Sequence, residues 1–362
     1  MAKTRIIAFY LPQYYPTKSN NEWYGNGFTE WTNVCSARPL FIGHKQPHIP
    51  ADLGFYDLRL NQTRIDQATI AKKYGIEGFC YYYYRFNDKY HELDLPLKLM
   101  FESKEPDFPY MLCWANETWK KKMWNKDGSL NKDSKILAEQ LYLGKDDYRS
   151  FFQEVLPMLK DNRYIQIDGK PAFMIYKPFD FPDTIEFIKL WNELARENGL
   201  RGIYFIAQTC DIKKDKEKLF NMGFDSIQIN GLREYWKQRN VILKLFSKIT
   251  RTIFNLPLIS SYKKASRYFV FDEESEERIV PTIIPNWDHT PRTGSRGSLL
   301  QGSNPDLFEK HLMDVNQLIK DKPEEFRISF LMAWNEWAEG NYIEPDREFG
   351  CSYLERLRKV FN

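Results

Sequence analysis

Short apolar, β-rich segments recur along the chain, and helical patterns lie between most of them. Most of these segments are continuously apolar, which is typical of strands buried on both faces of a parallel sheet. The eight segments are Arg5–Tyr10, Gly78–Tyr84, Tyr110–Ala115, Ala172–Tyr176, Ile203–Gln208, Ser226–Ile229, Val280–Ile284 and Ile328–Ala333. The pattern therefore predicts an α/β protein with a parallel sheet.

Several helical segments carry recognisable end signals. Asp183 precedes one helix as a candidate N-cap, and Gly75 and Gly199 follow two others. The clearest helices are Gln62–Tyr74, Asp146–Leu159, Thr184–Asn198, Asp306–Ile319 and Tyr353–Phe361. Eight strand–helix units predict a (β/α)8 TIM barrel, and a doubly wound open sheet is the alternative.

The chain has 362 residues, which is longer than the roughly 250 of an ordinary barrel. The excess falls in three segments that follow strands: Leu11–Asn61, Asn116–Lys145 and Asn230–Ile279. Loops after strands lie at the C-terminal face, where barrel active sites sit. We therefore expect one catalytic domain over residues 1–362, with long inserted loops at that face.

Aromatic residues make up 16% of the chain, more than a core usually requires, so we expect a ligand that stacks on flat rings, such as a sugar. Most tryptophans lie at or just after a predicted strand end: Trp23, Trp31, Trp114, Trp119, Trp124, Trp287, Trp334 and Trp337. A formal net charge of only +3 does not indicate a nucleic-acid partner.

Two glutamates, Glu336 and Glu339, follow the last predicted strand in the segment AWNEWAEG. If the strand runs into a helical turn, their Cβ atoms stand about 5–6 Å apart. Carboxyl groups this close suit chemistry at a glycosidic bond, where one is held protonated and the other ionised. Mutual repulsion and the flanking tryptophans would separate their pKa values. The alternative is a pair of solvated loop glutamates.

Other residues near strand ends are candidates for substrate binding: Tyr10, Glu30, Trp31, His48, Tyr84, Trp114, Asn116, Glu117, Trp287, Asn335 and Trp337. Glu117 is the rival catalytic carboxylate. Glu30 is equally well interpreted as a structural clamp, and His48 as a histidine that braces its loop. Tyr84 is the last inward ring of Tyr81–Tyr84, whose side chains alternate across a strand.

Several common site motifs are absent. There is no P-loop, no GxGxxG and no GxSxG. There is also no Asp-x-Asp pair, and that absence counts against many nucleotide-sugar transferases. Five histidines without HxH or HExxH spacing make a metal site unexpected. We expect no cofactor.

The five cysteines are odd in number and form no CxxC, and Cys80 and Cys113 lie in apolar runs, which suits reduced thiols. The first residues contain no apolar signal-peptide core, and no apolar run is long enough to span a bilayer. These features favour a cytoplasmic protein, and they leave its oligomeric state open.

Residues 230–279 form a basic insertion. Between residues 231 and 268 there are nine Lys or Arg residues and one acid. Apolar positions at helical spacing are Ile242, Leu245, Phe246, Ile249, Ile253 and Leu256, with Lys244, Lys248 and Arg251 on another face. This predicts a basic amphipathic helix, which would either dock peripherally at the inner membrane or pack on the barrel.

Many separate motifs together resemble the WbsX-type glycosyltransferase family, which is similar to glycoside hydrolase family 99. They occur in order as AFYLPQYYP, NEWYGNGFTEWTNV, RPLFIGHKQPHIPADLGFYDLR, YGIEGFCYYYYRF, FPYMLCWANETW, IDGKPAFMIY, PNWDHTPR and AWNEWAEGNYIEPD. The resemblance runs from about Arg5 to the C-terminus and weakens across 230–279. It implies a (β/α)8 barrel and a role in O-antigen or capsule biosynthesis, with an oligosaccharide or lipid-linked glycan as substrate.

The endo-α-mannosidases of family 99 proper match mainly in the last segment. There a similar Glu-x-x-Glu pair cleaves with retention through an anhydro-sugar, which implies that Glu336 is the base at the sugar 2-hydroxyl and Glu339 the acid/base. We therefore expect a retaining hydrolase or transglycosylase. The alternatives are a nucleotide-sugar-dependent glycosyltransferase and a non-catalytic glycan-binding protein.

Overall fold

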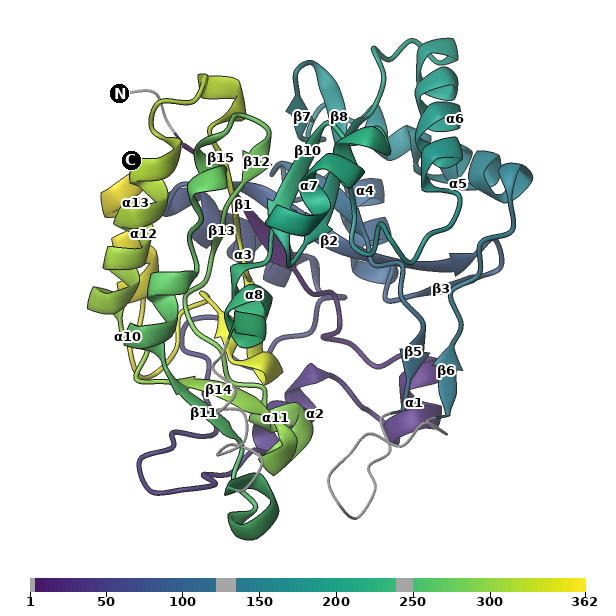
Figure 1. Cartoon of the computed structure of the whole chain (residues 1–362). Helices are drawn as coiled ribbons and strands as arrows, with labels where there is room; N and C mark the ends of the chain where they lie inside the picture. The colour runs from purple at the N-terminus through teal and green to yellow at the C-terminus, as the bar shows by residue number, and fades with distance from the viewer. Residues whose placement is uncertain (1–3, 122–134, 239–249) are drawn as a thin grey trace.

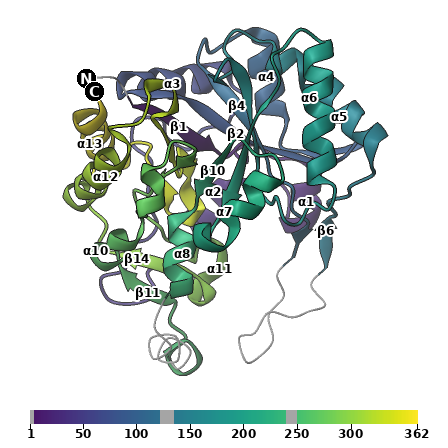
Figure 2. The same cartoon turned by 45° about the horizontal axis from the view of Figure 1, so that its top comes forward.

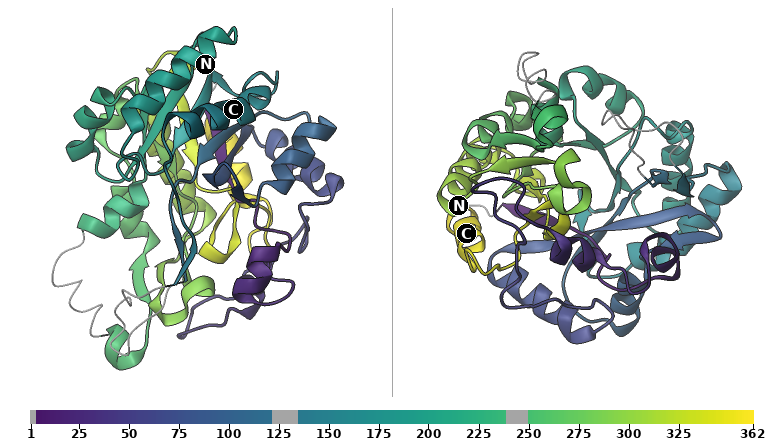
Figure 3. Two further views of the ribbon diagram at one scale, coloured as in Figure 1. Left: turned by 90° about the vertical axis from the view of Figure 1, so that its right-hand side faces the viewer. Right: turned by 90° about the horizontal axis from the view of Figure 1, so that it is seen from below.

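The computed structural model describes residues 4–121, 135–238 and 250–362 (Figure 1). Parallel strands form a ring that is clearest in the view from below (Figure 3). In ring order they are β12 (Ile279–Val280), β10 (Ser226–Ile229), β9 (Tyr204–Thr209), β8 (Lys170–Ile175), β4 (Tyr110–Trp114), β2 (Ile76–Asn87), β1 (Arg5–Tyr10), β15 (Ile328–Leu331) and β13 (Thr282–Ile283). The predicted TIM barrel is confirmed, and each expected strand segment overlaps a strand.

The seventh expected strand is divided into two short strands, β12 and β13, which together close the barrel. β12 pairs with β10 and β13 pairs with β15, and Pro281 separates them. Proline lacks the N–H that a continuous ladder needs, but its carbonyl accepts from the Phe330 N–H at 3.0 Å. The buried Thr282 hydroxyl contacts both the Gln228 side chain and the Ile229 carbonyl, which ties this strand to β10.

Helices surround the ring (Figure 2). Those that follow barrel strands along the chain are α3 (Asn61–Lys73), α4 (Leu95–Ser103), α5 (Lys145–Leu159), α6 (Thr184–Glu197), α7 (Ile212–Asn221), α12 (Pro305–Ile319) and α13 (Ser352–Phe361). Local sequence explains the start of α12, because the Asn304 side chain accepts from the Leu307 N–H and Pro305 occupies the first helical position. The five clearest predicted helices are all present, with no end shifted by more than one residue.

Most described elements of the inserted segments lie in the lower half of Figure 1, toward the C-terminal end of the strands. They contain α1 (Lys18–Tyr24), α2 (Glu30–Ser36), β5 (Trp119–Lys120), β6 (Ile136–Ala138), α8 (Gly231–Gln238), β11 (Leu258–Ser261) and α10 (Tyr262–Ala265). Part of the basic insertion is anchored to the barrel, because β11 pairs with β14 (Ser298–Gln301) and the buried Tyr262 hydroxyl donates to the Ile284 carbonyl at 2.7 Å.

The expected amphipathic helix falls largely on residues 239–249, which lie outside the described residues, as does Trp124. Residues 250–254 are helical, and Ile253 and Phe254 are exposed. Within the three described ranges, no helix combines the length and apolar character needed to cross a bilayer.

Candidate active site

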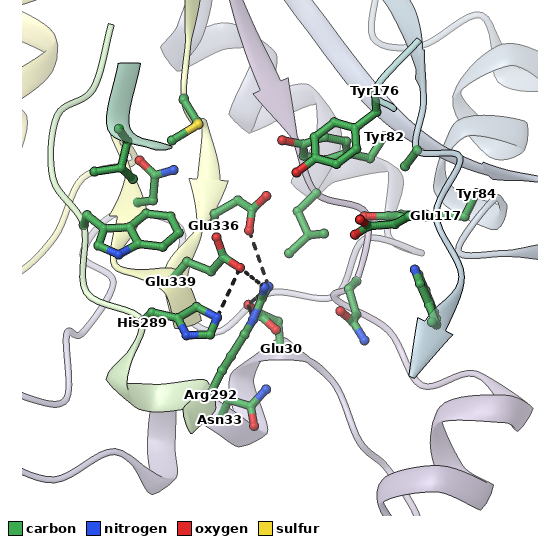
Figure 4. A pocket seen from close by; sticks show the side chains of 18 of the residues that line it. Glu30, Asn33, Tyr82, Tyr84, Glu117, Tyr176, His289, Arg292, Glu336 and Glu339 are labelled. Carbon is green, nitrogen blue, oxygen red and sulfur yellow. Dashed lines mark hydrogen bonds and ion pairs between the residues drawn. The ribbon is translucent and has the colours of Figure 1, made fainter. Parts of the chain in front are cut away.

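A cavity of about 550 Å³ opens at the C-terminal end of the strands. Its walls combine carboxylates with aromatic rings, as Figure 4 shows. Six of the thirteen sequence candidates line it: Glu30, Tyr84, Glu117, Trp287, Glu336 and Glu339. The structure therefore brings together residues from the first, second, third, seventh and eighth strand ends.

The two central glutamates come from a tight hairpin after β15. It is built from β16 (Asn335–Glu336), a 3₁₀ turn at Trp337–Glu339 and β17 (Asn341–Tyr342). Gly340 ends the turn at a φ of +52°, where an added Cβ would lie 2.7 Å from the backbone nitrogen of Asp288. The Glu339 carbonyl accepts from that same N–H at 2.7 Å. This close approach fixes the hairpin against the loop after β13.

Asp288 anchors the loop that faces the hairpin. Its carboxylate accepts from His44 Nε2 at 2.8 Å, Gln46 Nε2 at 2.7 Å and the Thr290 N–H at 2.9 Å. Burial opposes ionisation of Asp288, but these donors hold its pKa below the usual value. The short helix α11 (Thr290–Thr293) begins at this anchor and carries Arg292.

Arg292 connects three carboxylates, as the dashed lines to Glu336 and Glu339 in Figure 4 partly show. Its Nε donates to Glu30 Oε1 at 3.0 Å, and its Nη2 contacts the same oxygen. Nη1 contacts Glu339 Oε1, and Nη2 lies 3.4 Å from Glu336 Oε2. Burial lowers the pKa of Arg292, but the three carboxylates raise it more, so the guanidinium stays charged. His289 Nε2 lies 3.6 Å from Glu339 Oε1 on the cavity side.

The two central glutamates differ in their surroundings. Burial raises the pKa of Glu336 well above its usual value, the charge of Glu339 adds to this, and Arg292 offsets only part of it. Glu339 is more exposed, at 19% of its side chain against 10% for Glu336, and it makes the closer contact with Arg292. These surroundings favour the protonated form of Glu336.

Tyrosine and tryptophan rings form the remaining walls. Tyr82 and Tyr84 point into the cavity from β2, whereas Tyr83 points outward and contacts Glu154 on α5. Trp287 stacks on His289 with ring centroids 5.8 Å apart and an interplanar angle of 5°. Burial raises the pKa values of Tyr82 and Tyr84, and the nearby Glu336 charge adds to the effect, so both keep their hydroxyl protons.

The other seven candidates lie outside the cavity: Tyr10, Trp31, His48, Trp114, Asn116, Asn335 and Trp337. Asn335 braces the hairpin against the first strand end, because its Oδ1 accepts from the Leu11 N–H at 2.8 Å and its Nδ2 donates to the Leu11 carbonyl at 3.0 Å. Trp337 points away from Glu336, stacks on Tyr342 and donates from Nε1 to Glu344 Oε2 at 2.6 Å.

The remaining five also make structural contacts. The Tyr10 hydroxyl donates to Gln67 on α3 at 2.7 Å, and the Trp31 indole donates to the Tyr56 carbonyl at 2.8 Å. Trp114 points outward, and its Nε1 donates to the Arg85 carbonyl at 2.9 Å. The Asn116 side chain donates from Nδ2 to the Lys177 carbonyl and accepts at Oδ1 from the Lys177 N–H. His48 packs edge-on against Tyr342.

Arg292, Tyr82, Arg233 and Trp236 were not among the candidates, although they line the cavity. Tyr176, the last residue of a predicted strand, and His289, five residues after another, also line it. The position of Arg292 in the PNWDHTPR segment, after the seventh strand, was an available signal. In the described residues, no group of three or more His, Cys, Asp or Glu is arranged to hold a metal ion.

Comparison with known proteins gives a consistent assignment. A family model described as Glycosyltransferase WbsX matches residues 6–357. A protein of Xanthomonas campestris pv. campestris named "Uncharacterized protein WxcX" is 30% identical over 356 residues, covering 98% of this chain and 49% of that protein. Its counterpart in strain B100 is also 30% identical, over 361 residues, with the same coverage. The chain thus spans about half the length of these relatives.

Solved structures with the same fold include GH99 endo-α-mannosidase from Bacteroides thetaiotaomicron in complex with bis-tris propane. That structure has a TM-score of 0.58 at 14% identity and covers 98% of this chain and 95% of its own. A glycoside hydrolase-like protein has a TM-score of 0.61 at 14% identity and covers 100% and 95%. The fold is therefore GH99-like, and this chain belongs to the family described as Glycosyltransferase WbsX.

Proposed function

We propose that this chain is a retaining hydrolase or transglycosylase that acts on glycosidic bonds of a bacterial surface polysaccharide during its assembly. One observation carries the proposal: Glu336 and Glu339 lie in one cavity, walled by aromatic rings, at the C-terminal end of a barrel. Paired carboxyl groups in unequal surroundings are the usual machinery of glycosidic-bond chemistry. The whole chain would act as one catalytic domain, with 230–279 inserted in it.

The roles implied by family resemblance are Glu336 as base at a sugar 2-hydroxyl and Glu339 as acid/base. The raised pKa of Glu336 supports the first role, because a less acidic carboxyl is a stronger base once it is ionised. The second role requires Glu339 to carry a proton, which its contact with Arg292 opposes. Substrate entry must therefore weaken that contact before Glu339 can protonate a leaving oxygen.

The aromatic walls support a sugar substrate. Tyr84 and Trp119 pack with ring centroids 4.9 Å apart at one side, and Trp287 and His289 stack at the other. Such faces pack well against the apolar side of a pyranose ring, while the carboxylates bond its hydroxyls. We propose an oligosaccharide or lipid-linked glycan, reached from the cytoplasmic side, with residues 231–268 in peripheral contact with the inner membrane.

The test uses oligosaccharides prepared from the surface polysaccharide of the producing bacterium. Glu336→Gln and Glu339→Gln should each abolish turnover while oligosaccharide binding persists, and ¹H NMR of the wild-type product should show retained anomeric configuration. Glu348→Gln, which changes an exposed glutamate outside the cavity, is the control. Loss of turnover in Glu117→Gln with full activity in Glu336→Gln would transfer the chemistry to Glu117.

The family description favours one second candidate, a nucleotide-sugar-dependent transfer reaction. It predicts that UDP- or GDP-sugars bind to the cavity, and calorimetry measures this directly. If none binds, the donor is a glycan. A purely glycan-binding protein would instead keep its biological activity in both Glu336→Gln and Glu339→Gln.

One structural neighbour is a mannosidase in complex with bis-tris propane, an amine that carries many hydroxyls. A cavity with Glu30, Glu336 and Glu339 suits the same chemistry, because ammonium groups pair with carboxylates and the hydroxyls resemble those of a sugar. We therefore infer that bis-tris propane binds here, which provides a probe that does not require the natural glycan.

A further inference from the structure

We propose that Arg292, oriented by Glu30, is a built-in counter-ion that occupies the carboxylate pair until a ligand takes its place at Glu339. Glu30 and Arg292 are thus positioning residues. This inference rests on the proposed role of Glu336 and Glu339, but it concerns the state of the site before any reaction. It goes beyond the pair itself, because it assigns work to the first inserted loop and to α11.

The contacts of Arg292 divide into a buried anchor and a more exposed contact. Glu30 has only 1% of its side chain exposed and receives two donors, Nε and Nη2, on the single oxygen Oε1. Glu30 is held in turn, because its backbone N–H donates to the Gln13 carbonyl at 2.9 Å. Buried in this way, Glu30 holds Arg292 in place through Oε1.

The contact with Glu339 is the more exposed one. The Glu339 side chain is 19% exposed and that of Arg292 is 24% exposed, and Nη1 reaches Glu339 Oε1 from the cavity side. A ligand group that binds Glu339 can therefore displace Nη1 while Nε and Nη2 stay on Glu30. The guanidinium would keep its anchor, and Glu339 would become free to exchange a proton.

The local charge makes such a counter-ion necessary. Glu30, Glu336 and Glu339 converge with side chains that are 1%, 10% and 19% exposed, and Arg292 contacts all three. His289, which can also carry a positive charge, lies 3.6 Å from Glu339. Its charge opposes protonation of both central glutamates, and it contacts Glu339 more closely than Glu336. Removal of this charge should raise the affinity of the site for a cationic ligand and make the carboxyl groups easier to protonate.

The first experiment measures bis-tris propane binding by calorimetry at low salt to wild type, Arg292→Met and Arg292→Lys. Arg292→Met should bind the probe about tenfold more tightly or better, because a like charge about 4 Å away is removed even at an effective dielectric constant of about 20. Arg292→Lys keeps the charge and should stay within about threefold of wild type. Arg347→Met removes an exposed arginine outside the cavity and should not change the affinity.

Equal or weaker binding by Arg292→Met overturns the proposal, and so does an absence of binding by both proteins. A second measurement applies even if the variant is less stable. With its counter-ion gone, Arg292→Met should lose more thermal stability relative to wild type at pH 8 than at pH 5, because protonation at lower pH relieves the repulsion between the carboxylates. A pH-independent loss contradicts the inference. Neither readout involves turnover, so a failure here is distinct from a failure of the proposed glycosidic chemistry.

Discussion

Replacement of Gly340 by alanine should destabilise the protein more than an ordinary glycine substitution does. Gly340 has a φ of +52°, and an alanine Cβ there would lie 2.7 Å from both the backbone nitrogen and the Cβ of Asp288. Asp288 cannot easily retreat, because His44, Gln46 and Thr290 all donate to its carboxylate. The hairpin would have to move instead, and Glu339 with it.

Two contributions set the size of the effect. The left-handed backbone costs alanine about 1 kcal/mol relative to glycine. The forced overlap with Asp288 adds about 1–3 kcal/mol, which is typical of overpacking a filled space. The expected loss in the free energy of unfolding is therefore about 2–4 kcal/mol.

The chain offers a matched control at Gly350. This glycine has a φ of +55°, but nothing lies within 4 Å of the position that its Cβ would take. Gly350→Ala should therefore show only the backbone cost of about 1 kcal/mol. Urea unfolding followed by tryptophan fluorescence compares the two variants with wild type. If Gly340→Ala loses no more stability than Gly350→Ala, Asp288 does not hold the hairpin as described.

Three further predictions concern neighbouring residues. Trp337→Phe should lose about 2 kcal/mol of stability in urea unfolding, because the buried Glu344 loses a donor, while its oligosaccharide affinity in calorimetry stays unchanged. Trp287→Phe changes a residue of the cavity wall and should lose oligosaccharide affinity while its stability stays unchanged. Burial raises the pKa of Glu344 to about 7, so the folded state takes up a proton above the ordinary value of 4.5, and stability should fall by about 3 kcal/mol as pH rises through this window. Glu344→Gln should flatten that dependence in urea midpoints measured at pH 5 and pH 8. Thr282→Val should cost about 2 kcal/mol in urea unfolding, because it leaves the Ile229 carbonyl and the Gln228 amide without the hydroxyl that joins them.

The barrel could be predicted because its signals are local. Continuous apolar runs mark buried parallel strands, and residues such as Asp183 mark where helices begin. The interruption at Pro281 did not obscure the seventh strand, since two paired residues on each side still contribute to the ladders. The ends of the strands therefore pointed correctly to the region of the cavity.

The direction of each side chain at a strand end was harder to predict. Glu336 and Trp337 are adjacent, yet one faces the cavity and the other the core. Several tryptophans counted as possible sugar platforms are buried: Trp31, Trp114, Trp334 and Trp337. Trp31, Trp114 and Trp337 donate their indole N–H to partners inside the protein, so the high aromatic content reflects the core as well as the site.

The pairing of Arg292 was beyond sequence reasoning for a different reason. Glu30 lies 262 residues before Arg292 and Glu339 lies 47 residues after it, and nothing in the composition of one segment specifies its partner in another. Only the closed barrel brings these loops together. Long-range ion pairs at the C-terminal face thus follow from the fold, not from any single motif.

The carboxylate hairpin and the first inserted loop behave as one structural unit. Leu11 bonds Asn335 through both backbone groups, the Tyr14 hydroxyl accepts from the Trp337 N–H at 3.3 Å, and Glu30 holds Arg292 against the glutamates. A change in this loop should therefore alter the protonation of the carboxylates. The opposite wall, with Glu117 and Arg233, comes from the other two inserted segments. Because those segments supply wall residues and not the carboxylate hairpin, we expect substitutions there to change which glycan binds while the order of protonation at the pair is preserved.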